Sequence, residues 1–328
     1  MVKKLVNVYM KYPGLFGFGD YLRGSIYLLD YCQKNKLEFD MDFFDHPIGD
    51  YLNNSRNYQI NKKDVIMMDS FKECDNLCLD HLIIKDKINK IKKDVIFFSI
   101  NPILRNKIDD KQKKIILSKI EPNNFLQSKI NSSMIKLQIE PKKYSVVHIR
   151  IDDRFTNSDF HINQLINQIN ILLSNKLKNN NKYLLLSSSK ELKLKIVKKF
   201  PQLLIEDKEI THIGKEYNSD DIINSLVDFY LIYNSANIFQ LSEYAWGSGF
   251  SYWCSYLNNI PFQKVQILDN NINLINNALI QEKMEKIKKQ LELEKEQEVK
   301  EVKKENVILN ISSLKNNIIK HKLINKYK

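Results

Sequence analysis

Short runs of apolar and β-branched residues alternate with segments of helical periodicity along most of this 328-residue chain. Most of the runs are apolar enough to be buried on both faces, which is typical of parallel sheets covered by helices. The predicted strands are 4–10, 37–45, 64–70, 94–100, 144–151, 182–189, 202–207 and 237–242. This alternation predicts an α/β fold with parallel sheets.

Segments with apolar residues three and four positions apart follow most of these strands. The predicted helices are 21–36, 111–137, 161–177, 190–200, 220–236 and 247–259. A boundary near Glu140-Pro141 separates two α/β series, so we expect two Rossmann-like domains, 1–140 and 141–276, that face a cleft. Residues 277–328 are rich in Lys and Glu and predict a charged C-terminal helix, either solvated, docked or packed back across the hinge.

The formal charge of +12 raises the question of a nucleic-acid partner. Residues 281–328 carry 13 Lys and 8 Glu, so +5 of this total lies in the tail, and the other Lys residues are scattered. We therefore expect no nucleic-acid partner. A basic chain remains compatible with phosphorylated ligands, and the basic tail with peripheral contact to an anionic membrane.

The cysteines Cys32, Cys74, Cys78 and Cys254 form no recognisable metal motif, because no second Cys or His pair completes a zinc site. The first residues lead straight into a strand, and no signal peptide is visible. No apolar run is long enough to span a bilayer. These features predict a reducing, cytoplasmic setting with free thiols.

Two charged or titratable residues, His148 and Arg150, interrupt the apolar strand 144–151. Side chains alternate along a strand, so both point to the same side. Arg150 lies at the strand's carboxyl end, where open α/β sheets bind ligands. A guanidinium there suits phosphate oxygens, and the alternative is an internal salt bridge to Asp152 or Asp153.

A glycine-containing stretch, GFGDYLRG at 17–24, links the first strand to the first helix. Gly17 and Gly19 would let backbone N–H groups approach an anion, or the turn is purely structural and capped by Asp20. Arg23, one turn into the helix, either reaches the cleft or lies in solvent. The third glycine falls too late for the G-x-G-x-x-G dinucleotide fingerprint, which makes NAD a poor fit.

Two serine-containing turns are further candidates. Ser188 and Ser189 end a strand and begin a helix, where capping is favoured over holding a ribose or phosphate. The stretch WGSGFSYW places Ser248, Gly249 and Ser251 near a helix N-terminus, which is a second candidate phosphate cradle.

The acidic candidates are few. Asp228, on the predicted helix 220–236, is either solvated or accepts two hydrogen bonds from a guanine edge. Asp40 and Asp42 form the one close pair suited to Mg²⁺ in the first half, and they fall within a predicted strand.

Taken in order, these segments resemble a known family. HIRIDD at 148–153 resembles the H-x-R-R-x-D motif of the α1,2-, α1,6- and protein O-fucosyltransferases and the bacterial nodulation fucosyltransferases. GFGDYLRG is similar to their glycine loop, YLLLSSSKELKLKIVKKFP to their second motif, and LVDFYLIYNSANIFQLS with SGFSYWCSYL to their third. The resemblance covers roughly residues 5–262, with the first 130 matched by the loop alone.

The resemblance implies a GT-B fold and a metal-independent, inverting transfer of fucose from GDP-fucose to a glycan or other hydroxyl acceptor, with no cofactor. GDP-fucose would bind mainly to the second domain. Arg150 would contact the donor pyrophosphate, His148 and Asp228 would recognise guanine, and Ser251 or Ser248 would lie near the β-phosphate.

Asp153 matches the last, structural aspartate of the motif, but the chain departs from the family elsewhere. Ile151 stands in place of the second arginine, and Ser188-Ser189 in place of an acidic pair. The α1,6 enzymes carry a glutamate base after the arginines, and here Asp159 is the candidate base. The departures leave two alternatives: a glycosyltransferase with another nucleotide sugar, or a glycosyltransferase-fold binding or scaffold protein without turnover.

Overall fold

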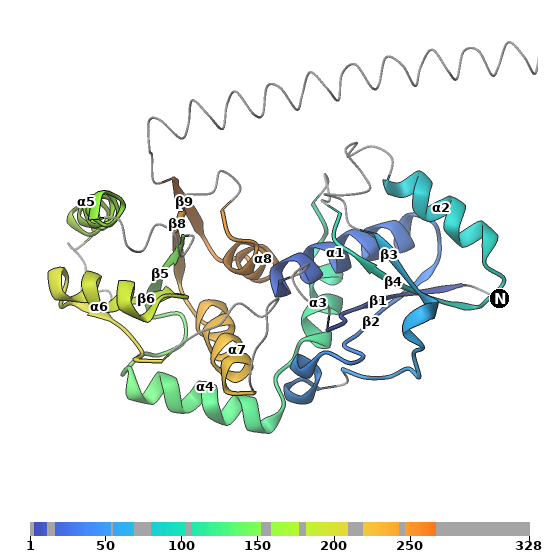
Figure 1. Cartoon of the computed structure of the whole chain (residues 1–328), viewed down its shortest axis with the longest axis horizontal. Coiled ribbons are helices and arrows are strands. Elements are labelled where there is room, and N and C mark those ends of the chain that lie inside the picture. Colours follow the sequence, from blue (N-terminus) through green and yellow to red (C-terminus); the bar gives the residue numbers. More distant parts are fainter. Residues whose placement is uncertain are drawn as a thin grey trace, which may run out of the picture. The chain divides into compact units, whose positions relative to one another are not determined.

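The computed structural model describes residues 3–11, 17–53, 55–68, 80–102, 107–151, 159–176, 182–208, 219–242 and 247–266. Residues Met1–Asp269 form one compact unit, and the predicted charged C-terminal helix lies outside the described residues. The described part contains two sheets whose strand pairs are all parallel, which confirms the predicted α/β class (Figure 1). The domain boundaries at 140 and 276 stay a prediction.

The first sheet has the strand order β2-β1-β4-β3. Its strands are β1 (Lys4–Val8), β2 (Glu38–Asp42), β3 (Val65–Met68) and β4 (Val95–Ile100). The helices of this half are α1 (Phe18–Lys34), α2 (Asp80–Lys90) and α3 (Asp110–Lys119), with the 3-10 helices η1 (Pro47–Tyr51) and η2 (Lys62–Asp64).

The second sheet has the order β7-β6-β5-β8-β9. Its strands are β5 (Tyr144–Arg150), β6 (Lys182–Ser187), β7 (Leu203–Leu204), β8 (Asn237–Ser242) and β9 (Phe262–Gln266). The remaining helices are α4 (Asn124–Lys136), α5 (Asp159–Lys176), α6 (Lys190–Lys199), α7 (Ser219–Tyr233) and α8 (Gly249–Asn258). None of the described helices is long and apolar enough to cross a membrane.

Several details differ from the sequence-based prediction. The predicted helix 111–137 is two helices, because Pro122 interrupts it and Asn123 caps α4 by accepting a hydrogen bond from the Leu126 amide. Helix α1 begins at Phe18, three residues before the predicted start at residue 21, and Gly17 is its N-cap. Strand β9 was not predicted, because its sequence FQKVQ carries too few apolar residues.

The second sheet separates two clusters of apolar side chains, as alternation along its strands requires. Val147 and Ile149 of β5 pack with α5 and α6, whereas Tyr144 and Val146 pack with α7 and α8. Figure 1 shows these helix pairs on opposite sides of the sheet. His148 and Arg150 alternate with Val147 and Ile149, so they belong to the α7/α8 side.

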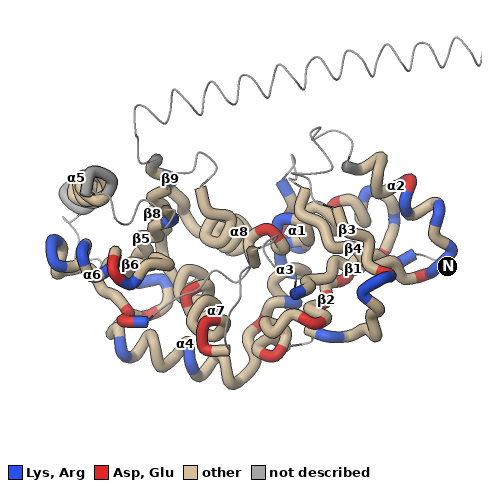
Figure 2. The backbone as a smooth tube through the Cα atoms, viewed as in Figure 1, with Lys and Arg blue, Asp and Glu red and all other residues tan. Residues whose placement is uncertain are grey.

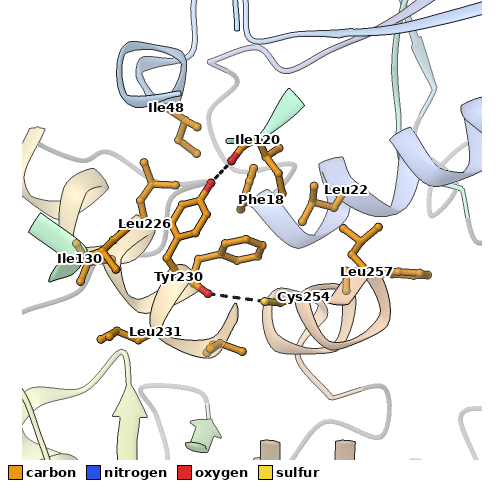
Figure 3. Packing of buried hydrophobic residues seen from close by; sticks show 14 of the residues in the cluster. Phe18, Leu22, Ile48, Ile120, Ile130, Leu226, Tyr230, Leu231, Cys254 and Leu257 are labelled. Carbon is orange, nitrogen blue, oxygen red and sulfur yellow. Dashed lines mark hydrogen bonds between the residues drawn. The ribbon is translucent and has the colours of Figure 1, made fainter. Parts of the chain in front are cut away.

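One cluster includes residues from both halves of the chain, as Figure 3 shows. The rings of Phe18 in α1 and Phe229 in α7 meet edge to face, with their centroids 5.0 Å apart. The hydroxyl of Tyr230 donates a hydrogen bond to the carbonyl of Ile120. The Tyr256 hydroxyl accepts one from the Ile108 amide at 2.7 Å. Apolar packing and hydrogen bonds therefore join the two sheets through α1, α7 and α8.

Two helices approach each other at glycine. A Cβ atom added to Gly19 of α1 would lie 2.4 Å from the backbone carbon of Gly249 and 2.6 Å from the amide nitrogen of Phe250, both in α8. Farther along α1, a Cβ at Gly24 would lie 1.7 Å from the carbonyl oxygen of Ile100. Two of the glycines in GFGDYLRG therefore permit close backbone packing of α1.

This contact predicts losses of stability of different size at its two glycines. We expect Gly19→Ala to lower the free energy of unfolding by about 1–3 kcal/mol, because rigid backbone atoms must move apart. Gly249→Ala places its Cβ at least 3.5 Å from its neighbours, an ordinary contact, so it should cost much less. Urea unfolding of both variants tests this, and equal losses would contradict the packing account.

Candidate functional site

The candidate site lies at the carboxyl ends of β5 and β8. From β5 the chain proceeds to β6 and β7 on one side and then returns to β8 on the other. Such a reversal of strand order is where open α/β sheets bind ligands. His148 pairs in register with Gln240, and Arg150 pairs with Ser242. The structure therefore places the predicted His148 and Arg150 at the switch point.

A hydrogen-bonded set of side chains connects this edge to α8. The Nδ1 atom of His148 lies 2.8 Å from the Ser251 Oγ, and the Gln240 Nε2 donates to the same oxygen at 2.6 Å. His148, Gln240 and Ser251 are all buried. Gln240 could not be identified from the sequence, because a glutamine within an apolar strand carries no motif of its own.

Burial also determines the charge of His148. Loss of hydration lowers its pKa from 6.5 to about 3, and the positive charge of Arg150 acts in the same direction. His148 is therefore a neutral imidazole at physiological pH.

Arg150 ends β5 and is partly exposed. The ion pairs within the described part of the chain do not include it. Asp152 and Asp153, its alternative partners in the sequence analysis, lie outside the described residues, and so does any role of Asp153. A partly exposed guanidinium at this edge is suited to binding an anion.

The turn before α8 is organised around Gln240. The Ser248 amide donates to the Gln240 Oε1, and the Gln240 Nε2 donates to the Ser248 carbonyl, both at 3.0 Å. Gly247 has a φ of +77°, and a Cβ there would lie 2.0 Å from the Gln240 Oε1. Gly249 then begins α8, a helix without charged residues (Figure 2). The glycine and serine pattern thus serves a backbone turn that Gln240 holds.

The first glycine stretch has structural roles in this conformation. The Gly17 amide donates to Asp20 at 3.2 Å, so Asp20 closes the start of α1 as predicted for a cap. Arg23 is buried, and it forms an ion pair with Asp20 at 3.1 Å and donates to the Asn101 carbonyl at 2.7 Å. Contact between Gly19 and Gly249 brings this stretch next to the start of α8.

The two serines after β6 behave as helix-capping residues. Ser189 is the N-cap of α6, and its hydroxyl accepts a hydrogen bond from the Leu192 amide at 3.2 Å. Its own amide donates to Ser187 at 3.3 Å. Ser188 and Ser189 are both partly exposed. The capping interpretation therefore accounts for Ser189.

Asp228 is not solvated, because it is buried and belongs to an ion network. Its carboxylate lies 2.8 Å from the Lys208 Nζ, which also contacts Glu206 at 2.6 Å. Lys193 is buried beside them, and its Nζ donates to the carbonyls of Glu206 and Lys208 at 3.1 and 3.0 Å. Two carboxylates thus balance two ammonium groups. The network could not be predicted from the sequence, because its members lie on three separate segments.

The electrostatics of this network follow from burial and pairing. Burial raises the pKa of Asp228, and Lys208 offsets part of that effect. Burial alone would lower the pKa of Lys208, but the carboxylates of Asp228 and Glu206 outweigh it and raise the pKa. Burial therefore outweighs pairing at Asp228, whereas pairing outweighs burial at Lys208.

The remaining candidates concern a base and a metal. Asp159 is the first residue of α5, nine positions after Arg150, and its side chain is outside the described set. Asp40 contacts Lys119 at 2.6 Å and Tyr58 at 2.6 Å, while Asp42 accepts from the amides of Phe44 and Asn57. Within the described residues, no cluster of His, Cys, Asp or Glu has the geometry to hold a metal ion.

The ion network predicts a large effect for one lysine. Lys208→Met leaves two buried carboxylates without their shared partner, which should lower the free energy of unfolding by about 3–5 kcal/mol. The control is Lys195→Met, which breaks the exposed pair between Lys195 and Glu191 and should cost less than about 1 kcal/mol. Chemical unfolding measures both, and a small effect at Lys208 would mean that water replaces it.

The neutral state of His148 predicts a pH dependence. The folded protein binds no proton at His148 until about pH 3, whereas the unfolded chain takes one up near pH 6.5. Stability is therefore lost as pH falls through this window, by up to about 1.4 kcal/mol per pH unit. Unfolding of the wild type and His148→Gln between these limits provides the test. The variant should show a shallower slope, and identical slopes would contradict the burial of a neutral imidazole.

Comparison with known proteins identifies the fold. A crystal structure of NodZ α-1,6-fucosyltransferase soaked with GDP-fucose matches with a TM-score of 0.53 and 14% identity, over 78% of this chain and 93% of that one. A structure of NodZ from Bradyrhizobium matches at 0.51 and 13%, over 82% and 96%. A variant of Arabidopsis thaliana FUT1 in complex with GDP matches at 0.52 and 11%, over 81% and 70%. No protein-family model matches the sequence, and no curated protein matches it. The chain therefore has the GT-B-like fold of these fucosyltransferases.

Proposed function

We propose that the chain is a glycosyltransferase that transfers fucose from GDP-fucose to a hydroxyl group of a glycan or other acceptor. The fold supports this proposal, because the similar structures contain GDP-fucose or GDP. The observation that carries it is the position of Arg150, a partly exposed guanidinium at the end of the central strand, where the strand order reverses.

In the proposed reaction, the acceptor oxygen attacks the anomeric carbon of fucose from the face opposite the nucleotide. The bond between that carbon and the β-phosphate oxygen breaks, and its electron pair leaves with GDP. Arg150 stabilises the charge that develops on the pyrophosphate, and the N-terminal end of α8 contributes its dipole. These groups supply positive charge without a metal ion.

The acceptor hydroxyl must also lose a proton. We assign the removal of this proton to Asp159, acting as general base. Asp159 begins α5 and follows the arginine of β5 in the chain. His148 contacts the guanine base. Asp228 shares its carboxylate with Lys208, so guanine would have to compete with an ammonium group for it.

The missing second arginine of the motif is compatible with this proposal. Ile151 is buried and packs in the cluster with α5 and α6, on the sheet face opposite the side of Arg150. A charge at position 151 would therefore face the apolar core rather than the pyrophosphate. Because Ile151 departs from the motif, two alternatives still need a test: a glycosyltransferase that uses another nucleotide sugar, and a binding protein without turnover.

The proposal predicts selective stabilisation by one nucleotide. GDP at 100 times its dissociation constant should raise the free energy of unfolding by about 2.7 kcal/mol, whereas UDP, GMP and NAD should do less. Arg150→Ala should weaken GDP binding by roughly 10- to 100-fold and abolish transfer, because a charge-assisted bond to phosphate is lost. Thermal unfolding with each nucleotide measures the binding.

The matched control is Arg56→Ala, which removes an arginine whose side chain is 39% exposed and paired with Asp50. GDP affinity should be unchanged in this variant.

A donor panel with a sugar-release readout then separates the alternatives. Release of the sugar from another nucleotide sugar would mean that the enzyme uses a different donor. Binding of GDP without release of a sugar from any donor, even with acceptors supplied, would favour a binding protein without turnover. No shift with any nucleotide would refute the proposal.

A further inference from the structure

We propose that Gln240, acting through Ser251, fixes His148 as the tautomer protonated at Nε2, so that His148 presents an N–H donor to the nucleotide. Gln240 and Ser251 are thus positioning residues. The ligand part of this inference rests on the proposed function, whereas the tautomer is a property of the free protein.

The orientation of the Gln240 amide is fixed by the backbone of Ser248. The Ser248 amide can only donate and its carbonyl can only accept, at 3.0 Å each. The Gln240 oxygen must therefore face the Ser248 amide, and its nitrogen must face the carbonyl. This arrangement leaves the second N–H of Gln240 to donate to the Ser251 Oγ at 2.6 Å.

The direction in which the Ser251 hydroxyl donates its hydrogen follows from the orientation of the Gln240 amide. Its hydroxyl is fully buried, accepts from Gln240 and has one hydrogen to donate. Among the described residues, its other hydrogen-bond partner is the Nδ1 atom of His148, at 2.8 Å. If Nδ1 carried the proton, the buried Ser251 hydrogen would have no acceptor there, which is costly. Nδ1 therefore accepts, and the neutral ring carries its proton on Nε2.

Ser251 therefore has a different role from the phosphate contact that the resemblance implies. The resemblance implies a serine near the β-phosphate, yet the Ser251 hydroxyl accepts from Gln240 and uses its single hydrogen to donate to His148, so none is left for a phosphate oxygen. We assign Ser251 to the orientation of His148. Gly247 supports the same arrangement, because a side chain at this position would collide with the Gln240 oxygen.

The tautomer can be read directly in the free, full-length protein by nitrogen-15 NMR of labelled histidine, with His148→Gln identifying the signal. The wild type should show the Nε2–H pattern. Ser251→Ala removes the donor to Nδ1 and should give a mixture of tautomers. Ser255→Ala is the control, since Ser255 lies one turn farther along α8, is buried, and donates only to the Ile260 carbonyl at 2.8 Å. It should keep the wild-type pattern.

Gln240→Glu provides a second variant that preserves shape. Its carboxylate, once ionised, can only accept hydrogen bonds. The Ser251 hydroxyl should then donate to Glu, and Nδ1 of His148 should become the donor, which inverts the tautomer. An Nδ1–H pattern in the wild type, or an unchanged Nε2–H pattern in both Ser251→Ala and Gln240→Glu, would overturn the proposal.

Binding of GDP tests the ligand part separately. Ser251→Ala and Gln240→Glu should raise the dissociation constant of GDP by up to about tenfold, the effect of one lost hydrogen bond, while Ser255→Ala should not. Failure of the wild type to bind GDP would refute the proposed function and leave the tautomer result standing. Tight GDP binding by a wild type with the Nδ1–H pattern would refute the positioning role alone.

Discussion

The backbone contact between Gly19 and Gly249 is the constraint on which the rest of the site depends. It brings the first turns of α1 and α8 closer than any side chain would allow. Phe18, Phe229 and Phe250 surround the contact, with ring centroids 5.0 and 5.3 Å apart in the two pairs. Because α8 is held in this way, Ser251 reaches His148 of β5, and the switch point of the second sheet acquires its polar edge.

Much of the fold could be predicted from the sequence, because strand and helix periodicities are local properties. Strand β5 and the shared side of His148 and Arg150 followed from alternation alone. The partners of these residues could not be predicted. Gln240 lies ninety-two positions from His148 in the sequence, and its amide comes close to His148 only because β5 and β8 pair in register. The sequence of GFGDYLRG left an anion loop and a structural turn as alternatives, and it could not show that Gly19 and Gly24 have packing partners far away in the chain.

Two buried polar groups near the second sheet are stabilised by different means. His148 avoids a buried charge by remaining neutral, and its ring nitrogen is paired with a hydroxyl. Asp228 keeps a partner instead, in a network whose two carboxylates and two ammonium groups compensate one another. This difference matters for ligand binding. A neutral imidazole is available to a ligand without breaking an ion pair, whereas a paired carboxylate is not.

The charge distribution at the switch point follows from the same principle. Helix α8 has no charged residue, and His148 is neutral, so Arg150 is the formal charge that β5 and α8 together present at this edge (Figure 2). An anion bound here would interact with a guanidinium that β5 and α8 do not neutralise. Burial is the main reason that His148 stays unprotonated, and the positive charge of Arg150 adds to it, which preserves the ability of Nδ1 to accept from Ser251. Arg150 thus also acts on the protonation state of the residue beside it.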